Sequence, residues 1–227
     1  MTRSHRRRTL AALAAGATLP AWLVGAPARA QPGATQEGYR LLASPQPAPA
    51  LRIEVLEFFY FGCPFCRELD SRLASWLKTL PDDVVFDRRP VIGRDSWAPL
   101  ARLHYALLAT GQSARLHGRV YDAVQAERLP LGELDAAAAW FEREGGEPAR
   151  LRAAWQSAEV DARVKQARVD TDAYDIQATP SLVVDGRWLT SSGLTRGVPG
   201  VLPMADRLID LARTERARAG ATMRPAR

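Results

Sequence analysis

Cysteine is scarce in this sequence, because the 227 residues include only Cys63 and Cys66, which are separated by two residues. A disulfide between them would close a loop too small to stabilise the fold usefully, since the entropic gain from a crosslink grows with loop length. A structural crosslink is therefore a poor explanation of the pair. Two buried structural thiols, or half of a metal site, stay open as alternatives.

Other signatures are also absent. The sequence has no P-loop, no G-x-G-x-x-G and no G-x-S-x-G motif, so nothing in it supports the enzyme classes that these motifs mark. His104 and His117 are the only histidines after residue 30. A zinc site needs four ligands, and zinc binding by the two cysteines would most readily use ligands from a second molecule. The sequence predicts no cofactor and no metal.

The net positive charge of the chain comes from its two ends. The formal net charge is +6, yet residues 1–30 hold five arginines and no acidic residue, and residues 212–227 hold five arginines against one glutamate. This charge belongs to a leader and a tail, not to a folded face that could bind phosphates. Nucleic-acid binding is therefore not predicted.

The first thirty residues have the pattern of a cleavable signal peptide. Basic residues precede an apolar run from Leu10 to Ala26, and Ala28-Arg29-Ala30 supplies the small residues of a cleavage site. The run is short of the ~20 residues that a membrane anchor needs and is broken by Gly16 and Pro20. The arginines before it match the twin-arginine signal only in part, which leaves the export route open. We expect an exported, soluble protein, and an oxidising compartment outside the cytosol lets a disulfide persist.

The first half of the mature chain predicts a strand–helix–strand unit. A proline-rich lead-in contains a short edge strand from Gly38 to Ala43. An apolar and aromatic run from Leu51 to Phe61 is typical of a strand buried on both faces. A helix follows from Cys63 and stops at Pro81, because its apolar residues recur at helical spacing. Val84 to Arg89 predicts the next strand.

The rest of the chain predicts a helical block and then a return to the sheet. Residues 97–171 show helical spacing and predict four helices, the last of which begins at Pro148. Asp185-Gly186 after the strand Ser181 to Val184 predicts a two-residue hairpin turn, and Leu202 to Leu211 a closing helix. The predicted organisation is an α/β domain, residues 31–95 and 172–212, a helical insertion, residues 96–171, and a disordered tail, residues 213–227.

The position of Cys63-Pro64-Phe65-Cys66, between a buried strand and a helix, predicts redox chemistry. A helix N-terminus presents unpaired N–H groups and the positive end of the helix dipole, and both stabilise a thiolate. Cys63 should therefore have a lowered pKa and act as the nucleophile. Cys66 lies one turn deeper, where it can resolve a mixed disulfide. Pro64 in the first turn costs no hydrogen bond and fixes the backbone beside the nucleophile.

Two further features favour this interpretation. Thr179-Pro180 is either an ordinary proline at the entry of a strand or a cis peptide bond that puts the backbone of Thr179 beside the cysteines. Glu57 lies inside the buried strand, where an acid costs free energy unless it is paired, so Arg88 or Arg89 is its expected partner. Glu57 could exchange a proton as Cys66 reacts, and a purely structural ion pair is an equal alternative.

Two short segments resemble a known family. The first is Val55-Leu56-Glu57-Phe58-Phe59-x-Phe61-x-Cys63-Pro64-x-Cys66, and the second is Thr179-Pro180 followed by Val183-Val184-Asp185-Gly186-Arg187. Both are similar to the DsbA family of bacterial periplasmic thiol oxidases. The helical block has the size and place of the inserted domain in that family.

The resemblance implies an α/β thioredoxin fold with an inserted all-helical domain. It also implies a surface-exposed Cys63, a buried Cys66 and a cis-Pro180 that shapes substrate docking. Glu57 would be the buried acid of the family, with Arg88 where the family often keeps its basic partner.

The chain departs from the best-known members at two positions. Those members carry histidine where Phe65 stands, and losing its partial positive charge should leave Cys63 less acidic and the disulfide less strongly oxidising. Thr179 stands where the oxidases often have an aliphatic residue and is similar to what isomerases and some reductases show. Both departures bear on the direction of electron flow.

The expected function is donation of the Cys63–Cys66 disulfide to exported proteins that contain cysteine pairs. The resemblance implies reoxidation by a membrane quinone-linked partner of the DsbB type, and the protein is expected to be a monomer. An exported reductase or isomerase on the same fold is the nearest alternative. A substrate-holding or metal-binding module with incidental cysteines is a more distant one.

Overall fold

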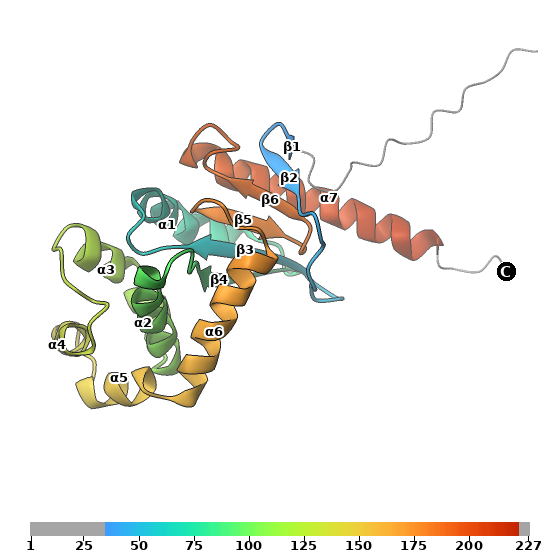
Figure 1. Ribbon diagram of the computed structural model, residues 1–227. Helices are drawn as coiled ribbons and strands as arrows, with labels where there is room; N and C mark the ends of the chain where they lie inside the picture. The colour runs from blue at the N-terminus through green and yellow to red at the C-terminus, as the bar shows by residue number, and fades with distance from the viewer. Residues whose placement is uncertain (1–34, 223–227) are drawn as a thin grey trace, which may run out of the picture.

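The computed structural model describes residues 35–222, in which helices surround a six-stranded sheet (Figure 1). The predicted signal peptide, residues 1–30, and the last five residues of the expected tail lie outside the described residues. Within residues 35–222, no helix is long and apolar enough to cross a membrane.

The sheet is mixed, with the strand order β1-β2-β6-β5-β3-β4. β3 pairs in parallel with β4 on one side and antiparallel with β5 on the other. The strand expected between residues 38 and 43 is β2, which is not at the edge because β1 pairs outside it. The strands are β1 (Thr35–Gln36), β2 (Tyr39–Leu41), β3 (Ile53–Phe59), β4 (Val84–Pro90), β5 (Ser181–Val184) and β6 (Trp188–Ser191).

β3 is buried on both faces, as its apolar run predicts. Because side chains alternate along a strand, Val55 and Leu56 point to opposite faces. Val55 packs in a core with α1 (Pro64–Trp76) and α7 (Val201–Thr222), and Leu56 packs against Tyr174 after the last inserted helix. Glu57 shares the face of Val55, and therefore lies on the side of the sheet that α1 covers.

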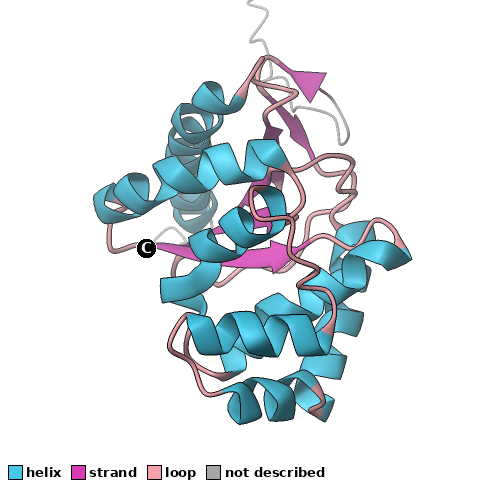
Figure 2. Cartoon of the chain, turned by 90° about the vertical axis from the view of Figure 1, so that its left-hand side faces the viewer, coloured by secondary structure: helices cyan, strands magenta, loops and turns pink. Residues whose placement is uncertain are grey.

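Five α-helices connect β4 to β5, and they gather beside and below the sheet in Figures 1 and 2. The inner faces of the first four form a second core that also contains Phe59, Phe61 and Cys66. This core therefore reaches the active-site segment directly. The helices are α2 (Ala98–Ala109), α3 (Ser113–Gln125), α4 (Leu134–Arg143), α5 (Pro148–Trp155) and α6 (Ala158–Ala173), preceded by a short 3₁₀ turn, η2 (Asp95–Trp97).

The fourth predicted helix is in fact two helices. The helix is interrupted at Ser157. The hydroxyl of Ser157 accepts a hydrogen bond from the N–H of Val160 at 3.2 Å and so caps α6. Trp155 packs with the second core, whereas Val160 packs with Ile92 and Tyr105. The sequence did not reveal this interruption, because the spacing of apolar residues on both sides of Ser157 fits one continuous helix.

The expected end of the closing helix is also wrong, since α7 continues to Thr222. Arg213 donates to both carboxylate oxygens of Asp83 at 2.9 and 3.0 Å, and Arg216 pairs with Asp185 in the β5–β6 turn. The arginines that suggested a disordered tail therefore attach the helix to the loops beside the sheet.

The predicted hairpin between β5 and β6 is confirmed, with one residue more in its turn. Asp185 and Gly186 both have positive φ, at 54° and 62°, which suits these residue types. Arg187 donates its N–H to Val184 at 3.1 Å, and the antiparallel pairing begins at Trp188.

Candidate active site

Cys63 occupies the N-cap position of α1, directly after the buried strand β3. Its carbonyl oxygen accepts hydrogen bonds from the N–H groups of Cys66 and Arg67 at 3.1 and 3.2 Å, and Pro64 fills the first helical position. The backbone N–H of Cys63 donates to the backbone carbonyl oxygen of Tyr60 at 2.9 Å. The helix therefore begins directly after Cys63, as the sequence predicts.

Local hydrogen bonding lowers the pKa of Cys63 to about 6. The side chain of Cys66 is the largest cause, and Thr179 and the N–H groups of Phe65 and Cys66 add to it, while partial burial opposes them. In the thiol form, Cys63 Sγ lies 3.3 Å from the carbonyl oxygen of Thr179 and can donate to it. A large fraction of Cys63 is thiolate at neutral pH, which is the nucleophilic form.

Cys66 has the opposite environment. Its side chain is fully buried in the core that the inserted helices share with Phe59 and Phe61. Burial raises the pKa of the Cys66 thiol, and the neighbouring Cys63 raises it further. The two sulfurs are thus divided into an accessible thiolate and a buried thiol.

The remaining residues of the motif and the Thr179-Pro180 segment lie around Cys63. The Thr179–Pro180 peptide bond is cis, as the resemblance implies. Phe65 is 57% exposed, so its ring is presented to solvent beside the nucleophile.

Glu57 forms the ion pair expected for a buried acid. Its side chain is completely buried, and Arg88 Nε donates to its Oε2 at 2.8 Å. Arg89, the other candidate partner, pairs instead with Asp170 at 2.7 Å. Burial raises the pKa of Glu57 to about 7, although the charge of Arg88 and its hydrogen bond lower it.

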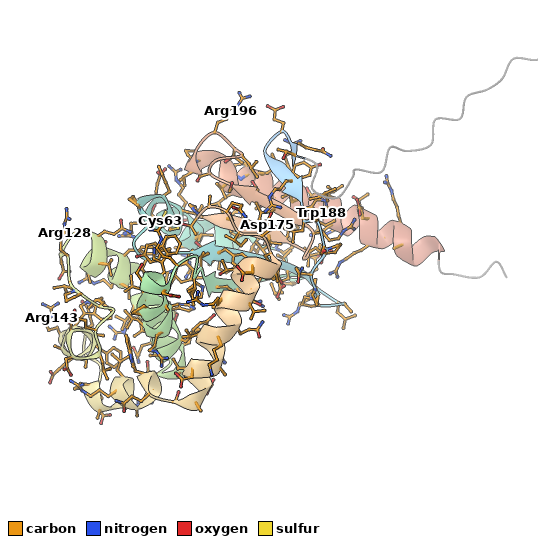
Figure 3. The ribbon with its side chains drawn as sticks, viewed as in Figure 1. Cys63, Arg128, Arg143, Asp175, Trp188 and Arg196 are labelled. Carbon is orange, nitrogen blue, oxygen red and sulfur yellow. The ribbon has the colours of Figure 1, made fainter. Side chains whose placement is uncertain are left out.

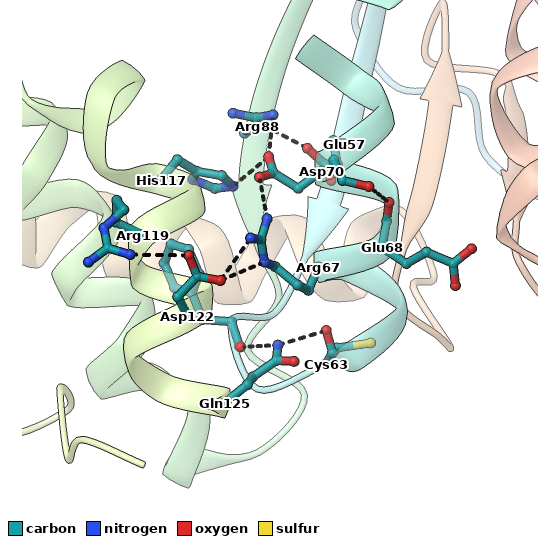
Figure 4. A network of polar contacts seen from close by, with 12 residues as sticks. Glu57, Cys63, Arg67, Glu68, Asp70, Arg88, His117, Arg119, Asp122 and Gln125 are labelled. Carbon is teal, nitrogen blue, oxygen red and sulfur yellow. Dashed lines mark hydrogen bonds and ion pairs between the residues drawn. The ribbon is translucent and has the colours of Figure 1, made fainter. Parts of the chain in front are cut away.

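The Glu57–Arg88 ion pair belongs to a larger network of charged residues that includes two residues of α1, as Figure 4 shows. Arg88 also contacts Asp70 at 2.9 Å, and Asp70 lies 3.8 Å from Arg67, which bonds to Asp122 of α3 at 2.7 Å. None of Asp70, Arg67 and Asp122 was predicted. Asp70 follows Cys63 by two helical turns, a spacing that could have indicated it.

Gln125, at the end of α3, was also missed. Its side-chain amide donates to the carbonyl oxygens of Phe61 at 2.8 Å and of Cys63 at 3.1 Å (Figure 4). A residue more than sixty positions away thus fixes the loop that carries the nucleophile. No local pattern in the sequence could reveal this contact, because it depends on how α3 packs.

The two histidines considered as zinc ligands lie within an aromatic cluster. The rings of His104 and His117 are 5.1 and 4.8 Å from that of Phe59. In the described part of the chain, no group of three or more potential ligands could hold a metal ion. Burial lowers the pKa of His104 to about 3 and that of His117 well below its usual value, so both are neutral.

Comparison with known proteins adds independent evidence. The profile of the DSBA-like thioredoxin domain matches residues 54–198. The thiol:disulfide interchange protein DsbA of Bordetella pertussis is 35% identical over 204 residues, which are 89% of this chain and 94% of that protein. Its namesake from Burkholderia cepacia is 32% identical over 186 residues, or 80% of this chain and 88% of that protein.

Solved structures agree with the sequence comparisons. The crystal structure of Pseudomonas aeruginosa DsbA matches with a TM-score of 0.75 and 27% identity, over 79% of this chain and 94% of that one. The oxidoreductase DsbA from Xylella fastidiosa matches with a TM-score of 0.72 and 28% identity, over 78% and 96%. The matched residues include Glu57, both cysteines and the Thr179-Pro180 segment. The chain belongs to the DsbA family of thiol:disulfide interchange proteins and has its thioredoxin fold.

Proposed function

We propose that the protein is an exported thiol:disulfide oxidoreductase that donates a Cys63–Cys66 disulfide to cysteine pairs of other exported proteins. The observation that carries the proposal is the division between the two sulfurs. Cys63 is partly exposed and has a pKa lowered to about 6, whereas Cys66 is buried and has a raised pKa. Membership of the DsbA family supports the same chemistry.

The reaction begins when a substrate thiolate attacks Sγ of Cys63 in the oxidised protein. The Cys63–Cys66 bond breaks, a substrate–Cys63 disulfide forms, and Cys66 leaves as a thiolate that takes up a proton. A second substrate thiolate then attacks the substrate sulfur, and Cys63 leaves as a thiolate. The substrate loses two electrons and the protein gains them. Stabilisation of the Cys63 thiolate lowers the free energy of the reduced protein and so favours this direction.

Glu57 supplies the proton that Cys66 takes up. Its pKa of about 7 leaves a fraction of Glu57 protonated at neutral pH, in a buried region where water cannot freely deliver a proton. Arg88 is its positioning partner, because the hydrogen bond at 2.8 Å fixes one carboxylate oxygen.

The other predicted residues act at the substrate side of Cys63. Thr179 and Pro180 form the edge against which the substrate docks, and the carbonyl oxygen of Thr179 borders the reacting sulfur at 3.3 Å. Pro64 fixes the first turn of α1, and Phe65 offers an exposed apolar contact without the positive charge of a histidine.

The cellular setting completes the proposal. The signal peptide at residues 1–30 directs the chain to the periplasm, where it acts as a monomer. A membrane quinone-linked partner of the DsbB type returns Cys63 and Cys66 to the disulfide. Residues 31–95 and 172–212 serve as the thioredoxin-like domain and residues 96–171 as its helical insertion.

The decisive experiment is equilibration of the purified protein with glutathione redox buffers while the Cys63–Cys66 disulfide is quantified. A reduction potential well above the glutathione couple is expected, and one near that of thioredoxin would instead indicate the exported reductase. The Cys63→Ser variant should lose the oxidation of reduced, unfolded substrates. Retained activity in that variant would contradict the mechanism.

A further inference from the structure

A cavity of about 250 Å³ has Thr179 in its lining, next to the reacting sulfur. One wall is the segment Ile176 to Thr179, which ends at the carbonyl that borders Cys63 Sγ. The opposite wall comes from the loop after β4 and includes Val91, Arg94 and Trp97. Thr179 therefore belongs both to the lining of this cavity and to the surroundings of the reacting sulfur.

Three apolar or aromatic residues of the cavity lining, Val91, Ile176 and Trp97, are held in place by packing. Val91 and Ile176 belong to the buried core below the sheet. Trp97 stacks on Tyr60, with ring centroids 4.1 Å apart and planes 10° apart. Tyr60 in turn accepts the N–H of Cys63 at 2.9 Å, so the aromatic wall is joined to the loop that carries the nucleophile. Such a surface can pack against the methylene groups of a side chain.

Arg94 gives the cavity its charge. The guanidinium lies over the ring of Trp97, 5.1 Å from the ring centroid, and the residue is exposed. Among residues 35–222, no carboxylate forms an ion pair with Arg94. The adjacent Asp95 pairs with Arg168 at 2.7 Å and not with Arg94. The mouth of the cavity thus presents one uncompensated positive charge on an aromatic support.

We infer that this cavity is a substrate subsite that takes an acidic side chain, glutamate or aspartate, from a residue that flanks the reacting cysteine. The inference rests on the proposed function and adds a preference among substrates to it. The methylene groups of the side chain would pack on Trp97 and Ile176, and its carboxylate would pair with Arg94. A guanidinium stacked on an aromatic ring is held in place and can bind a carboxylate with two parallel hydrogen bonds.

The test uses the oxidised full-length protein and a set of reduced dithiol peptides. The peptides differ only at the residue beside the first cysteine, which is Glu, Gln, Lys or Phe. The second-order rate constant of disulfide transfer is measured for each peptide at low and high ionic strength. Wild type should oxidise the Glu peptide about three to five times faster than the Gln peptide, a preference of the size that exposed ion pairs provide. The ratio of the Glu-peptide rate to the Gln-peptide rate should fall towards one at high salt.

Variants separate the subsite from intrinsic peptide reactivity. A neighbouring carboxylate changes the thiol pKa of the peptide itself, so the informative quantity is the Glu-to-Gln rate ratio in wild type divided by that ratio in Arg94→Gln. Arg94→Glu should reverse the preference and favour the Lys peptide. Arg143→Gln is the matched control, since Arg143 is also exposed and lies apart from Cys63 on α4 (Figure 3); its ratio should equal that of wild type.

The outcomes distinguish the two proposals. If no peptide is oxidised, the proposed function fails. If all peptides are oxidised but the ratio is the same in wild type, Arg94→Gln and Arg94→Glu, the function stands and the subsite inference is overturned. A Phe peptide that is fastest in every variant would also overturn it, because the cavity would then select an aromatic ring by its walls alone.

Discussion

The surroundings of Cys63, on the outer side of the pair, stabilise a charged thiolate, whereas those of Cys66, on the inner side, favour the neutral thiol. On the outer side, Cys63 is approached by backbone N–H groups and by Thr179, and its pKa falls to about 6. On the inner side, Cys66 meets a core in which several buried polar atoms have no hydrogen-bond partner among the described residues. They include Glu57 Oε1, Tyr121 Oη and both ring nitrogens of His117. One side favours the charged form of a thiol, and the other opposes it.

The inner side opposes charge of either sign. Burial raises the pKa of Cys66, Glu57 and Tyr121, all of which would become negative. It lowers the pKa of His104 and His117, which would become positive. Each of these groups is shifted towards its neutral form. Arg88 remains charged there, because Glu57 and Asp70 face it at 2.8 and 2.9 Å.

Among the variants considered, removing the charge of Arg88 should change the free energy of unfolding most. In Arg88→Met, Glu57 loses its partner inside the core, and we expect the free energy of unfolding to fall by about 3–5 kcal/mol at pH 8. The pKa of Glu57 is already raised to about 7 in the folded state. The folded protein therefore holds a proton that the unfolded chain releases, and stability falls as pH rises from about 4.5 through 7. The loss in Arg88→Met should be smaller at pH 5, where Glu57 is protonated.

Urea denaturation at pH 5 and pH 8 measures this difference. Arg213→Met is a suitable control, because Arg213 pairs with Asp83 where both side chains are about two-fifths exposed. That variant should change stability by less than about 1 kcal/mol. A loss below 1 kcal/mol at both pH values in Arg88→Met would mean that the inner side accommodates the charge of Glu57 without Arg88.

The buried histidines predict an acid sensitivity of the inner side. Their pKa values are lowered in the folded state, so the unfolded chain binds protons first, and stability present above pH 6.5 is lost as the pH falls. At pH 5 the burial of neutral His104 should cost about 2 kcal/mol, and His117 should lower stability in the same direction. Glu57 acts in the opposite direction between about pH 4.5 and 7, which makes comparison of variants at the same pH essential.

His104→Leu and His117→Leu should each flatten the dependence of the unfolding free energy on pH between 4 and 6.5. The measurement is a series of urea transitions across that range, with the pH 7.5 values as reference. If both variants keep the wild-type slope, the acid sensitivity arises elsewhere in the protein.

Replacing Phe65 tests the outer side. In Phe65→His, a partial positive charge beside the sulfur should lower the pKa of Cys63 by about one unit and raise the reduction potential by about 30 mV. Phe65→Leu, which adds no charge, should leave both near the wild-type values. The rate of alkylation by iodoacetamide as a function of pH gives the pKa, and glutathione equilibration gives the potential. An unchanged pKa in Phe65→His would show that an exposed side chain at this position does not reach the thiolate.

The reacting groups on both sides were more predictable from sequence than the tertiary contacts that surround them. Cys63 at a helix start follows from local patterns, and so does the strand that carries Glu57. The partner of Glu57 was narrowed to two arginines, and β3–β4 register selects Arg88, which lies directly opposite Glu57. Gln125 and the Arg94–Trp97 wall depend on how the inserted helices and loops pack, and no spacing in the sequence encodes that. The break at Ser157 and the extension of α7 were missed because apolar periodicity does not report capping or ion pairs.

Removal of a single hydroxyl gives the smallest predicted effect and the sharpest test of the inner side. Tyr121 is fully buried, its ring lies 5.0 Å from that of Phe61, and its hydroxyl has no partner in the part of the chain that is described. A buried hydroxyl without a partner destabilises the fold, so Tyr121→Phe should leave the free energy of unfolding unchanged or raise it by up to about 1 kcal/mol. The pKa of Cys63 should not change. A loss of more than 1 kcal/mol in urea denaturation would instead reveal a hydrogen bond to buried water, and the inner side would then be less hostile to polar groups than its contacts indicate.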